Sequence, residues 1–315
     1  MLGVFLALGA ALGYAAASVL QHREAHADAD VAGSGLRLVG RLARRPLWLA
    51  GVGADAAAYG FQAAALGVGA LLVVQPVITA GLLFALPASA RLAGRRIGRS
   101  DVLWGAVLAA GLAVFLALAV GDGGRDRAPA ADWLVCALVL GPAMAASLVV
   151  GGRATGTRRA VLFALATGAL FGVTAALTKA TVVLLDHHGL GALRAGEPYA
   201  LVLLGGVGFV LNQRAFQAGA LTASLPTLTV VEPLVAAVIG LTMLDERVRA
   251  EGVLGWAAVV LSAVAMAAAT AVLARSSARL DAPHEHELAA ALVALDHARE
   301  DSLRDSSRSA STETQ

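Results

Sequence analysis

The chain of 315 residues is 58% hydrophobic and 15% charged, with a formal net charge of +2 and a mean hydropathy of +0.74. Because about a quarter of the residues of soluble domains are charged, this composition excludes an ordinary soluble globular protein. The chain has a single cysteine, Cys136, which lies inside an apolar run. Because there is no second cysteine, an intramolecular disulfide and thiol-based metal chemistry are excluded. The composition indicates a protein of the lipid bilayer.

Apolar runs follow one another from the first residues to about residue 274. A helix needs about 20 mostly apolar residues to cross a hydrocarbon core of roughly 30 Å. The predicted spans cover approximately 2–20, 47–67, 70–90, 102–120, 132–150, 160–184, 198–218, 221–243 and 253–274. The longest apolar stretches exceed one crossing at ~1.5 Å per residue, so we expect turns at 67–69 and near 219–222. The predicted fold class is all-α: a polytopic membrane protein with about nine transmembrane helices.

The arginines divide unequally between the loops of the two predicted membrane sides. One side carries Arg23, Arg37, Arg41, Arg44, Arg45, Arg91, Arg95, Arg96, Arg99, Arg153, Arg158, Arg159, Arg275 and Arg279. The other side carries Arg125, Arg127, Arg194, Arg247 and Arg249. Because basic residues concentrate in cytoplasmic loops, we expect a multi-pass protein of the cytoplasmic membrane with its N-terminus outside and its C-terminus inside.

Two stretches of the chain repeat each other. Phe61-Gln-Ala-Ala-Ala-Leu66 leads to Val73-Val-Gln-Pro76, and Phe216-Gln-Ala-Gly-Ala-Leu221 leads to Val230-Val-Glu-Pro233. A Gly-x-x-x-Gly pair precedes each stretch, and small residues at this spacing let helices pack closely in lipid. These predicted helix-packing residues are Gly9, Gly13, Gly168 and Gly172.

The repeats predict a domain organisation. We expect a first four-helix block at 1–121, a linking transmembrane helix with its loops at 122–158, and a second four-helix block at 159–274. The polar cytoplasmic tail, 275–315, is predicted to form a short helix followed by disorder. Equivalent helices of the two blocks are an odd number of crossings apart, so the second block enters the membrane inverted. Inverted repeats place a substrate site at their interface and permit alternating access.

Several short motifs are similar to those of a known family. They are Arg44-Arg-Pro-x-Trp-Leu49, the two Phe-Gln-Ala-x-Ala-Leu stretches with the prolines that follow them, Trp104-Gly105, Ala176-Leu-Thr-Lys179 and Asn212-Gln-Arg-Ala-Phe216. Residues 1–274 resemble the drug/metabolite transporter superfamily, in its EamA/NIPA-like branch. The nine-span layout is similar to that of the NIPA-type magnesium transporters and their bacterial relatives. The resemblance implies a membrane transporter and, for that branch, a magnesium substrate.

Charged side chains at membrane depth are expensive and often mark a transport path. Asp55 lies within the second span, Lys179 toward the outer end of the sixth, and Arg214 toward the inner end of the seventh. Glu232 lies near the middle of the eighth. The long stems of the two basic residues can reach a membrane surface, so snorkelling competes with a role in the path.

Glu232 is the strongest of these candidates because it precedes Pro233, whose ring removes a backbone hydrogen bond and can open the helix. A carboxylate beside freed carbonyl groups can coordinate a cation or exchange a proton in a coupled cycle. The alternative is a neutralising ion pair with Arg214 or Lys179. In the first block Gln75 precedes Pro76 at the matching place, so no acidic pair crosses the axis.

Asp55, Tyr59 and Gln62 are spaced i, i+4 and i+7, which places them on one helical face. That face offers a carboxylate, a phenol and an amide to a polar cargo, or it forms a hydrogen-bonded seam between helices. Gln217 is the repeat mate of Gln62, and Asn212 lies on the turns before it. Together with the four charged residues, these side chains and the two proline motifs make up the predicted transport path: Asp55, Tyr59, Gln62, Gln75, Pro76, Lys179, Asn212, Arg214, Gln217, Glu232 and Pro233.

The remaining polar groups are assigned to the surface. Asp245 and Glu246 end the eighth span as ordinary helix-end charges. The histidines at 187–188 are interpreted as a solvated loop pair, and the His-Glu-His-Glu motif at 284–287 as the start of a solvated helix. Weak metal binding is the alternative for both histidine groups.

These features predict a secondary transporter of a small polar solute or cation, with the bilayer and the substrate as partners and neither cofactor nor nucleic acid. Asp55 and Glu232 are the best metal candidates. Two separated acids with bases nearby make a poor Mg²⁺ cage, so the residues favour an organic solute whereas the resemblance implies magnesium. No histidine lies within a span, so an enzyme is not expected; a membrane scaffold remains the other alternative. The oligomeric state is left open.

Overall fold

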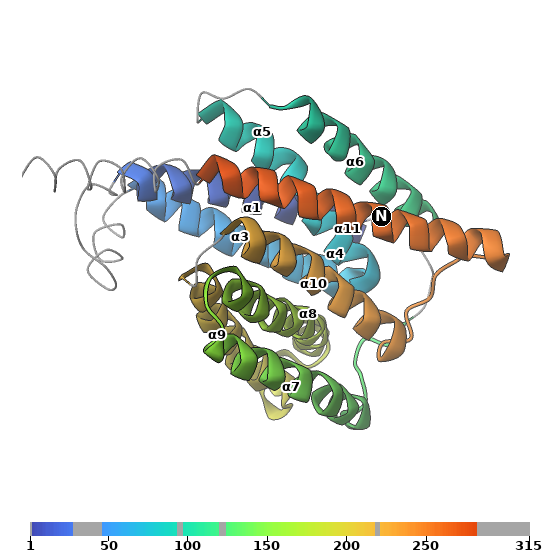
Figure 1. The fold of residues 1–315 in the computed structure, drawn as a ribbon. Coiled ribbons are helices and arrows are strands. Elements are labelled where there is room, and N and C mark those ends of the chain that lie inside the picture. Colours follow the sequence, from blue (N-terminus) through green and yellow to red (C-terminus); the bar gives the residue numbers. More distant parts are fainter. Residues whose placement is uncertain (1, 28–45, 93–96, 120–123, 218–220, 282–315) are drawn as a thin grey trace, which may run out of the picture.

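The computed structural model describes residues 2–27, 46–92, 97–119, 124–217 and 221–281, and the helices lie side by side as a bundle (Figure 1). None of the described residues lies in a strand. The elements are α1 (Leu2–Ala27), α3 (Pro46–Val68), α4 (Leu71–Thr79), α5 (Leu82–Leu92), α6 (Arg99–Ala119), α7 (Ala130–Arg153), α8 (Gly156–His188), η1 (Gly189–Arg194), α9 (Glu197–Gln217), α10 (Leu221–Thr242) and α11 (Gly252–Asp281). The predicted tail helix lies outside the described residues.

Six helical stretches of the described chain are long and apolar enough to cross a membrane. They are Leu71–Ala88, Arg99–Leu118, Ala130–Arg153, Gly156–Arg194, Ser224–Thr242 and Gly252–Ser276. Two shorter apolar helices cover Leu2–Ala17 and Glu197–Asn212. α3 is not among the six because Asp55, Tyr59 and Gln62 lower its hydropathy. The all-helical, multi-span architecture is therefore confirmed, while nine crossings and the inverted arrangement stay predictions.

The predicted span at 70–90 consists of two helices, α4 and α5. Pro76 lies inside α4 and Pro87 inside α5. A Cβ at Gly81, between the two helices, would lie 3.0 Å from the carbonyl oxygen of Ala11, so a glycine is needed where this break touches the backbone of α1. Because proline lacks an N–H and the break interrupts the helical hydrogen bonds, this segment is easily bent.

The helices pack in a few dominant pairs. α1 packs along α3, α6 along α11, and α4 against α10. α8 is the most buried of the six apolar stretches and contacts α3, α7, α9 and α10. α7 packs on α8 and is otherwise exposed. Contacts between helices of the first and second blocks therefore run along the middle of the bundle.

The matching glycine pairs bring helices close together but serve different partners. A Cβ at Gly13 would lie 2.8 Å from the Cβ of Ala58 on α3, and a Cβ at Gly172 would lie 2.8 Å from the Cβ of Val235 on α10. Gly9 faces a side chain of α3, and Gly168 faces one of α10. Each pair thus occupies a helix–helix contact that has no room for a side chain.

Replacing Gly172 by alanine is expected to lower the free energy of unfolding by about 1–3 kcal/mol, the usual cost of overpacking. The new Cβ would also lie 2.9 Å from the carbonyl oxygen of Glu232, which is backbone and cannot rotate away. Gly205→Ala is the matched control, because a Cβ there meets nothing within 4 Å. Unfolding in detergent titrations checks this: equal stability of the two variants would contradict the tight contact.

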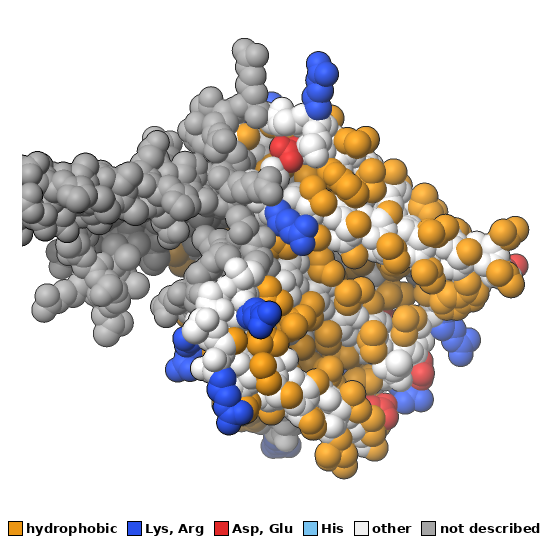
Figure 2. All heavy atoms as spheres, in the orientation of Figure 1, with side chains coloured by type: hydrophobic (Ala, Val, Ile, Leu, Met, Phe, Trp, Pro, Cys, Tyr) orange, Lys and Arg blue, Asp and Glu red, His pale blue; other side chains and the backbone are white. Residues whose placement is uncertain are grey.

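The outer surface of the bundle suits a hydrocarbon environment. In Figure 2 apolar side chains cover the face formed by α6, α10 and α11, and charged side chains gather toward the helix ends. Large exposed apolar residues on this face include Val102, Leu103, Val260 and Leu261. Exposed apolar area on this scale is typical of a surface covered by lipid.

Candidate functional site

Lys179 of α8 and Glu246 form an ion pair inside the bundle. The Lys179 Nζ lies 2.8 Å from Glu246 Oε1, and the two residues are only 6% and 4% exposed. Two charges removed from water are tolerated when they are paired and their remaining hydrogen-bonding groups are satisfied. The only lysine of the chain is thus neutralised within the bundle.

The carboxylate of Glu246 also caps a helix of the first block. The N–H of Leu71 donates to Oε1 at 2.6 Å, and the N–H of Leu72 donates to Oε2 at 2.8 Å. These two N–H groups belong to the first residues of α4, and the N-cap residue of this helix, Ala70, makes no side-chain hydrogen bond to cap it. The first N–H groups of a helix lack intrahelical partners and favour a negative charge. Glu246 therefore satisfies both the helix start and the lysine.

Two glycines make room for this carboxylate. A Cβ at Gly240 would lie 2.6 Å from Glu246 Oε2, and a Cβ at Gly124 would lie 3.1 Å from Glu246 Cγ. Because the hydrogen bonds to α4 and Lys179 hold Glu246 in place, the carboxylate cannot move aside. Any side chain at these positions would disturb the pair.

A turn after α10 returns the chain toward α4. Asp245 has a φ of 49°, a left-handed conformation that is uncommon outside glycine and typical of helix C-termini. The Glu246 N–H donates to the Gly240 carbonyl at 2.9 Å. Arg125 holds this turn through two contacts. Its side-chain Nε lies 2.7 Å from Asp245 Oδ2, and its backbone N–H donates to the Leu244 carbonyl.

These contacts join α4, α8, the connection between α10 and α11, and the segment that precedes α7. We call the part of the bundle around Leu71, Lys179 and Glu246 the α4 end. The prediction that Glu246 is an ordinary surface charge is wrong, because the turn buries it. Lys179 does not reach outward, and Glu246, rather than Glu232, is its partner.

A second set of polar side chains links α3 to α1 within the first block and to α8 of the second block. The Tyr14 hydroxyl of α1 donates to Gln62 Oε1 of α3 at 2.6 Å. The Tyr59 hydroxyl of α3 lies 3.1 Å from Thr178 Oγ1 of α8. Thr178 donates its own hydrogen to the Thr174 carbonyl at 2.8 Å, so Tyr59 is the donor in this second bond.

Two carboxylates that the sequence places in the transport path act electrostatically on Tyr14. They are Asp55 on α3 and Glu232 on α10. Asp55 is exposed in the bundle and Glu232 is partly buried. No motif singles out Tyr14, although a tyrosine inside an apolar span is itself a signal. We call these residues the polar cluster: Tyr14, Asp55, Tyr59, Gln62, Thr178 and Glu232.

The other predicted path residues make no hydrogen bond or ion pair with the polar cluster, as far as side chains are described. Gln75 of α4 is 2% exposed, and its Nε2 has no hydrogen-bond partner. The buried Oδ1 of Asn212 also has no partner, and Arg214 is exposed. Gln217 ends α9, and its side chain lies outside the described part. Buried amide groups without partners are functional candidates.

The two repeat-mate prolines, Pro76 of α4 and Pro233 of α10, are not part of the polar cluster. Pro76 and Pro233 both line an apolar cavity between α4, α6, α10 and α11. No group of three histidine, cysteine, aspartate or glutamate side chains that could hold a metal ion occurs among the described residues. The polar cluster thus offers hydroxyl, amide and carboxylate groups, whereas the cavity offers an apolar wall.

Comparison with known proteins finds a relative that matches most of the chain. No protein-family profile matches the chain, and no solved structure matches it. An uncharacterized protein of Corynebacterium glutamicum is 34% identical over 279 residues, which cover 88% of this chain and 96% of the relative. The similarity thus extends over most of both proteins, and the chain belongs to the family of this corynebacterial protein.

Proposed function

We propose that this protein is a secondary transporter, of the drug/metabolite transporter type, that moves a small polar solute or cation across the cytoplasmic membrane by alternating access. The observation that carries this proposal is the polar cluster. Its side chains come from α1, α3, α8 and α10, so both blocks contribute to it. Polar and ionisable groups gathered at membrane depth are costly and usually serve a substrate or ion path.

The packing of repeat mates supports an inverted pair of blocks. α4 and α10 carry the matching proline motifs and pack against each other, as do α6 and α11, the last helices of the two blocks. A two-fold axis in the membrane plane relates each helix to its mate, and mates that lie beside the axis pack on each other, as these two pairs do. In the proposed nine-span arrangement the N-terminus is outside, and the α4 end faces outward.

The proposed roles follow from the side-chain chemistry. Asp55 and Glu232 bind the positive or hydrogen-donating part of the substrate, and Glu232 is the coupling carboxylate. Tyr14 and Tyr59 hold the cluster together through their bonds to Gln62 and Thr178. The amide of Gln75 is available as a further donor, because no group in the described part of the chain accepts from its Nε2.

The α4 end supplies the closure that alternating access requires. Glu246 is bound to Lys179 of α8 and to the start of α4, so its carboxylate holds three segments of the chain together at this end of the bundle. Opening it separates the carboxylate from α4 or from Lys179. Such a pair of satisfied charges is a bistable contact, either complete or broken, and suits a gate.

A magnesium substrate is the second candidate. Mg²⁺ usually keeps several waters and is held by one or two carboxylates, so the acids around Tyr14 fit a hydrated ion better than a dry cage. The resemblance to NIPA-type transporters points the same way. An organic solute remains the first candidate because hydroxyl and amide groups make up most of the cluster.

Uptake into liposomes that contain the purified protein tests the function. The panel consists of labelled divalent cations and polar organic solutes, each measured with and without a pH gradient and against protein-free liposomes. Saturable uptake of one member is the expected result, and flux of Mg²⁺ that ignores the pH gradient favours the second candidate. Uptake equal to that of protein-free liposomes for every member would refute transport of these classes.

A further inference from the structure

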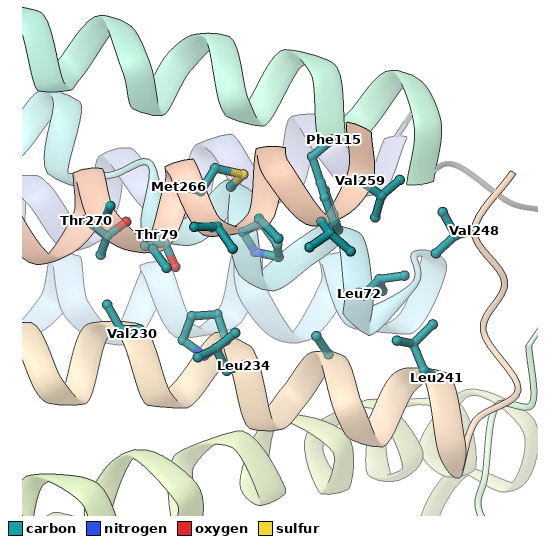
Figure 3. A pocket seen from close by; sticks show the side chains of 18 of the residues that line it. Leu72, Thr79, Phe115, Val230, Leu234, Leu241, Val248, Val259, Met266 and Thr270 are labelled. Atoms are coloured by element: carbon teal, nitrogen blue, oxygen red, sulfur yellow. The ribbon is translucent and has the colours of Figure 1, made fainter. Parts of the chain in front are cut away.

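An elongated apolar cavity lies on the side of the bundle where α10 and α11 face outward (Figure 3). Its volume is about 590 Å³, which lies within the range of ligand pockets. In Figure 3 the side chains of Leu72, Phe115 and Met266 point into the same space as Leu234 and Leu241. The cavity therefore has walls from α4, α6, α10 and α11.

The cavity is buried at its floor and open at its mouth. Leu72, Phe115 and Met266 form the floor and are almost completely buried. Val260 and Val264 stand at the mouth and are more than half exposed. The mouth is part of the apolar surface in Figure 2, so it opens sideways toward the hydrocarbon of the bilayer rather than toward water.

The lining offers little to a polar ligand. Among the residues that the structure describes, no charged side chain lines the cavity. Of its threonines, Thr79 donates to the Gln75 carbonyl at 3.0 Å, and Thr229 donates to the Leu225 carbonyl at 2.9 Å. The hydroxyl hydrogens of these two threonines are thus already used within the helices, and Thr270 is the third threonine of the described lining. A polar solute entering this space would lose its bonds to water without replacement, so the cavity is unsuited to the solute proposed for the polar cluster.

The shape of the cavity matches one hydrocarbon chain. Its lining on α10 runs from Thr229 to Leu241, about 18 Å along the helix axis at ~1.5 Å per residue. Half of a hydrocarbon core of roughly 30 Å is about 15 Å, which is the depth that a lipid chain of one leaflet occupies. A slot parallel to the helices, apolar throughout and open to the bilayer, fits such a chain along its length.

We propose that this cavity binds one acyl chain of a bilayer phospholipid, which enters between α10 and α11 and lies against Pro76 and Pro233. The chain then fills the space between the two proline-containing helices. This inference does not depend on the proposed function, because the residues of the polar cluster are not among those that line the cavity and the test below measures no transport.

Photo-crosslinking tests the proposal with the full-length protein in phospholipid vesicles. The vesicles contain a phosphatidylglycerol with a diazirine in the middle of one acyl chain, and adducts are mapped by mass spectrometry after irradiation. We expect adducts on the floor residues Phe115 and Met266 in addition to the exposed Val260 and Val264. Lipid that stays outside the bundle can label only exposed residues, so adducts confined to these would overturn the proposal.

Cavity-filling variants provide the second arm. Ala267→Phe on α11 and Ala237→Phe on α10 place a ring inside the cavity, because both alanines line it. We expect either change to abolish the floor adducts while the exposed adducts persist, which also shows that the variant is folded. Ala257→Phe is the matched control, since Ala257 is exposed on α11 and outside the lining. Floor adducts that survive both fillings would overturn the proposal.

Discussion

Replacing Glu246 by alanine is expected to lower the free energy of unfolding by about 3–5 kcal/mol, the cost of breaking a buried ion pair by removing one partner. The change leaves Lys179 charged and unpaired in the bundle. It also leaves the N–H groups of Leu71 and Leu72 without their acceptor. Unfolding of the purified protein by titration from mild detergent into SDS measures the loss.

Two further variants distinguish the loss of the Lys179–Glu246 ion pair from the loss of any carboxylate in this connection. Glu251→Ala removes an exposed carboxylate from the same connection and should change stability by less than about 0.5 kcal/mol. Lys179→Met combined with Glu246→Gln removes the unpaired charge and keeps an acceptor for α4, so the double variant should be more stable than Glu246→Ala. If Glu246→Ala is as stable as Glu251→Ala, the buried pair does not hold the α4 end together.

The sequence predicts the helices well because lipid requires long apolar helices whatever the tertiary contacts are. Each predicted run coincides with helical structure. The exception is the break between α4 and α5, which depends on the approach of Gly81 to Ala11 of α1. A contact between distant segments of this kind leaves no signal in local hydropathy. The topology of the two blocks is a further step and stays a prediction.

The role of Glu246 cannot be predicted from its neighbourhood in the chain. It follows α10 in a polar connection, where a carboxylate is ordinary, and its partners lie on α4 and α8. Two indirect signals exist. α4 begins after Ala70, which cannot cap it, and the only lysine of the chain lies inside an apolar span and needs a counter-charge. Neither signal identifies which acidic residue caps α4 or pairs with the lysine.

The sequence predicts the part of the polar cluster that lies on α3, but not its partners on other helices. Helical spacing alone places Asp55, Tyr59 and Gln62 on one face, so their proximity follows from the sequence. Which helix lies opposite that face depends on packing between the blocks. The structure supplies Tyr14 of α1 and Thr178 of α8 as the bonding partners.

Replacing Glu232 by glutamine is expected to weaken transport of the substrate found in the liposome panel by about 10- to 100-fold. The change keeps the shape of the side chain and removes its charge. A hydrogen bond to a charged group contributes ~1.5–3 kcal/mol, and each 1.4 kcal/mol corresponds to a factor of ten in affinity. The repeat mate of Glu232 is already an amide, Gln75, so the variant would make the two proline motifs alike and leave Asp55 as the one carboxylate near Tyr14.

Initial uptake rates over a range of substrate concentrations measure this effect, and Glu251→Gln serves as the control because that carboxylate is exposed and distant in the chain from the cluster. A proton-coupled carboxylate adds a second expectation: wild-type uptake responds to an imposed pH gradient, whereas the Glu232→Gln variant loses that response. Because a substrate-binding role alone raises the half-saturation concentration without removing the response, the two readouts distinguish coupling from binding. Uptake by Glu232→Gln equal to that of Glu251→Gln, with the gradient response intact, would remove Glu232 from the path and leave Asp55 as its charged residue.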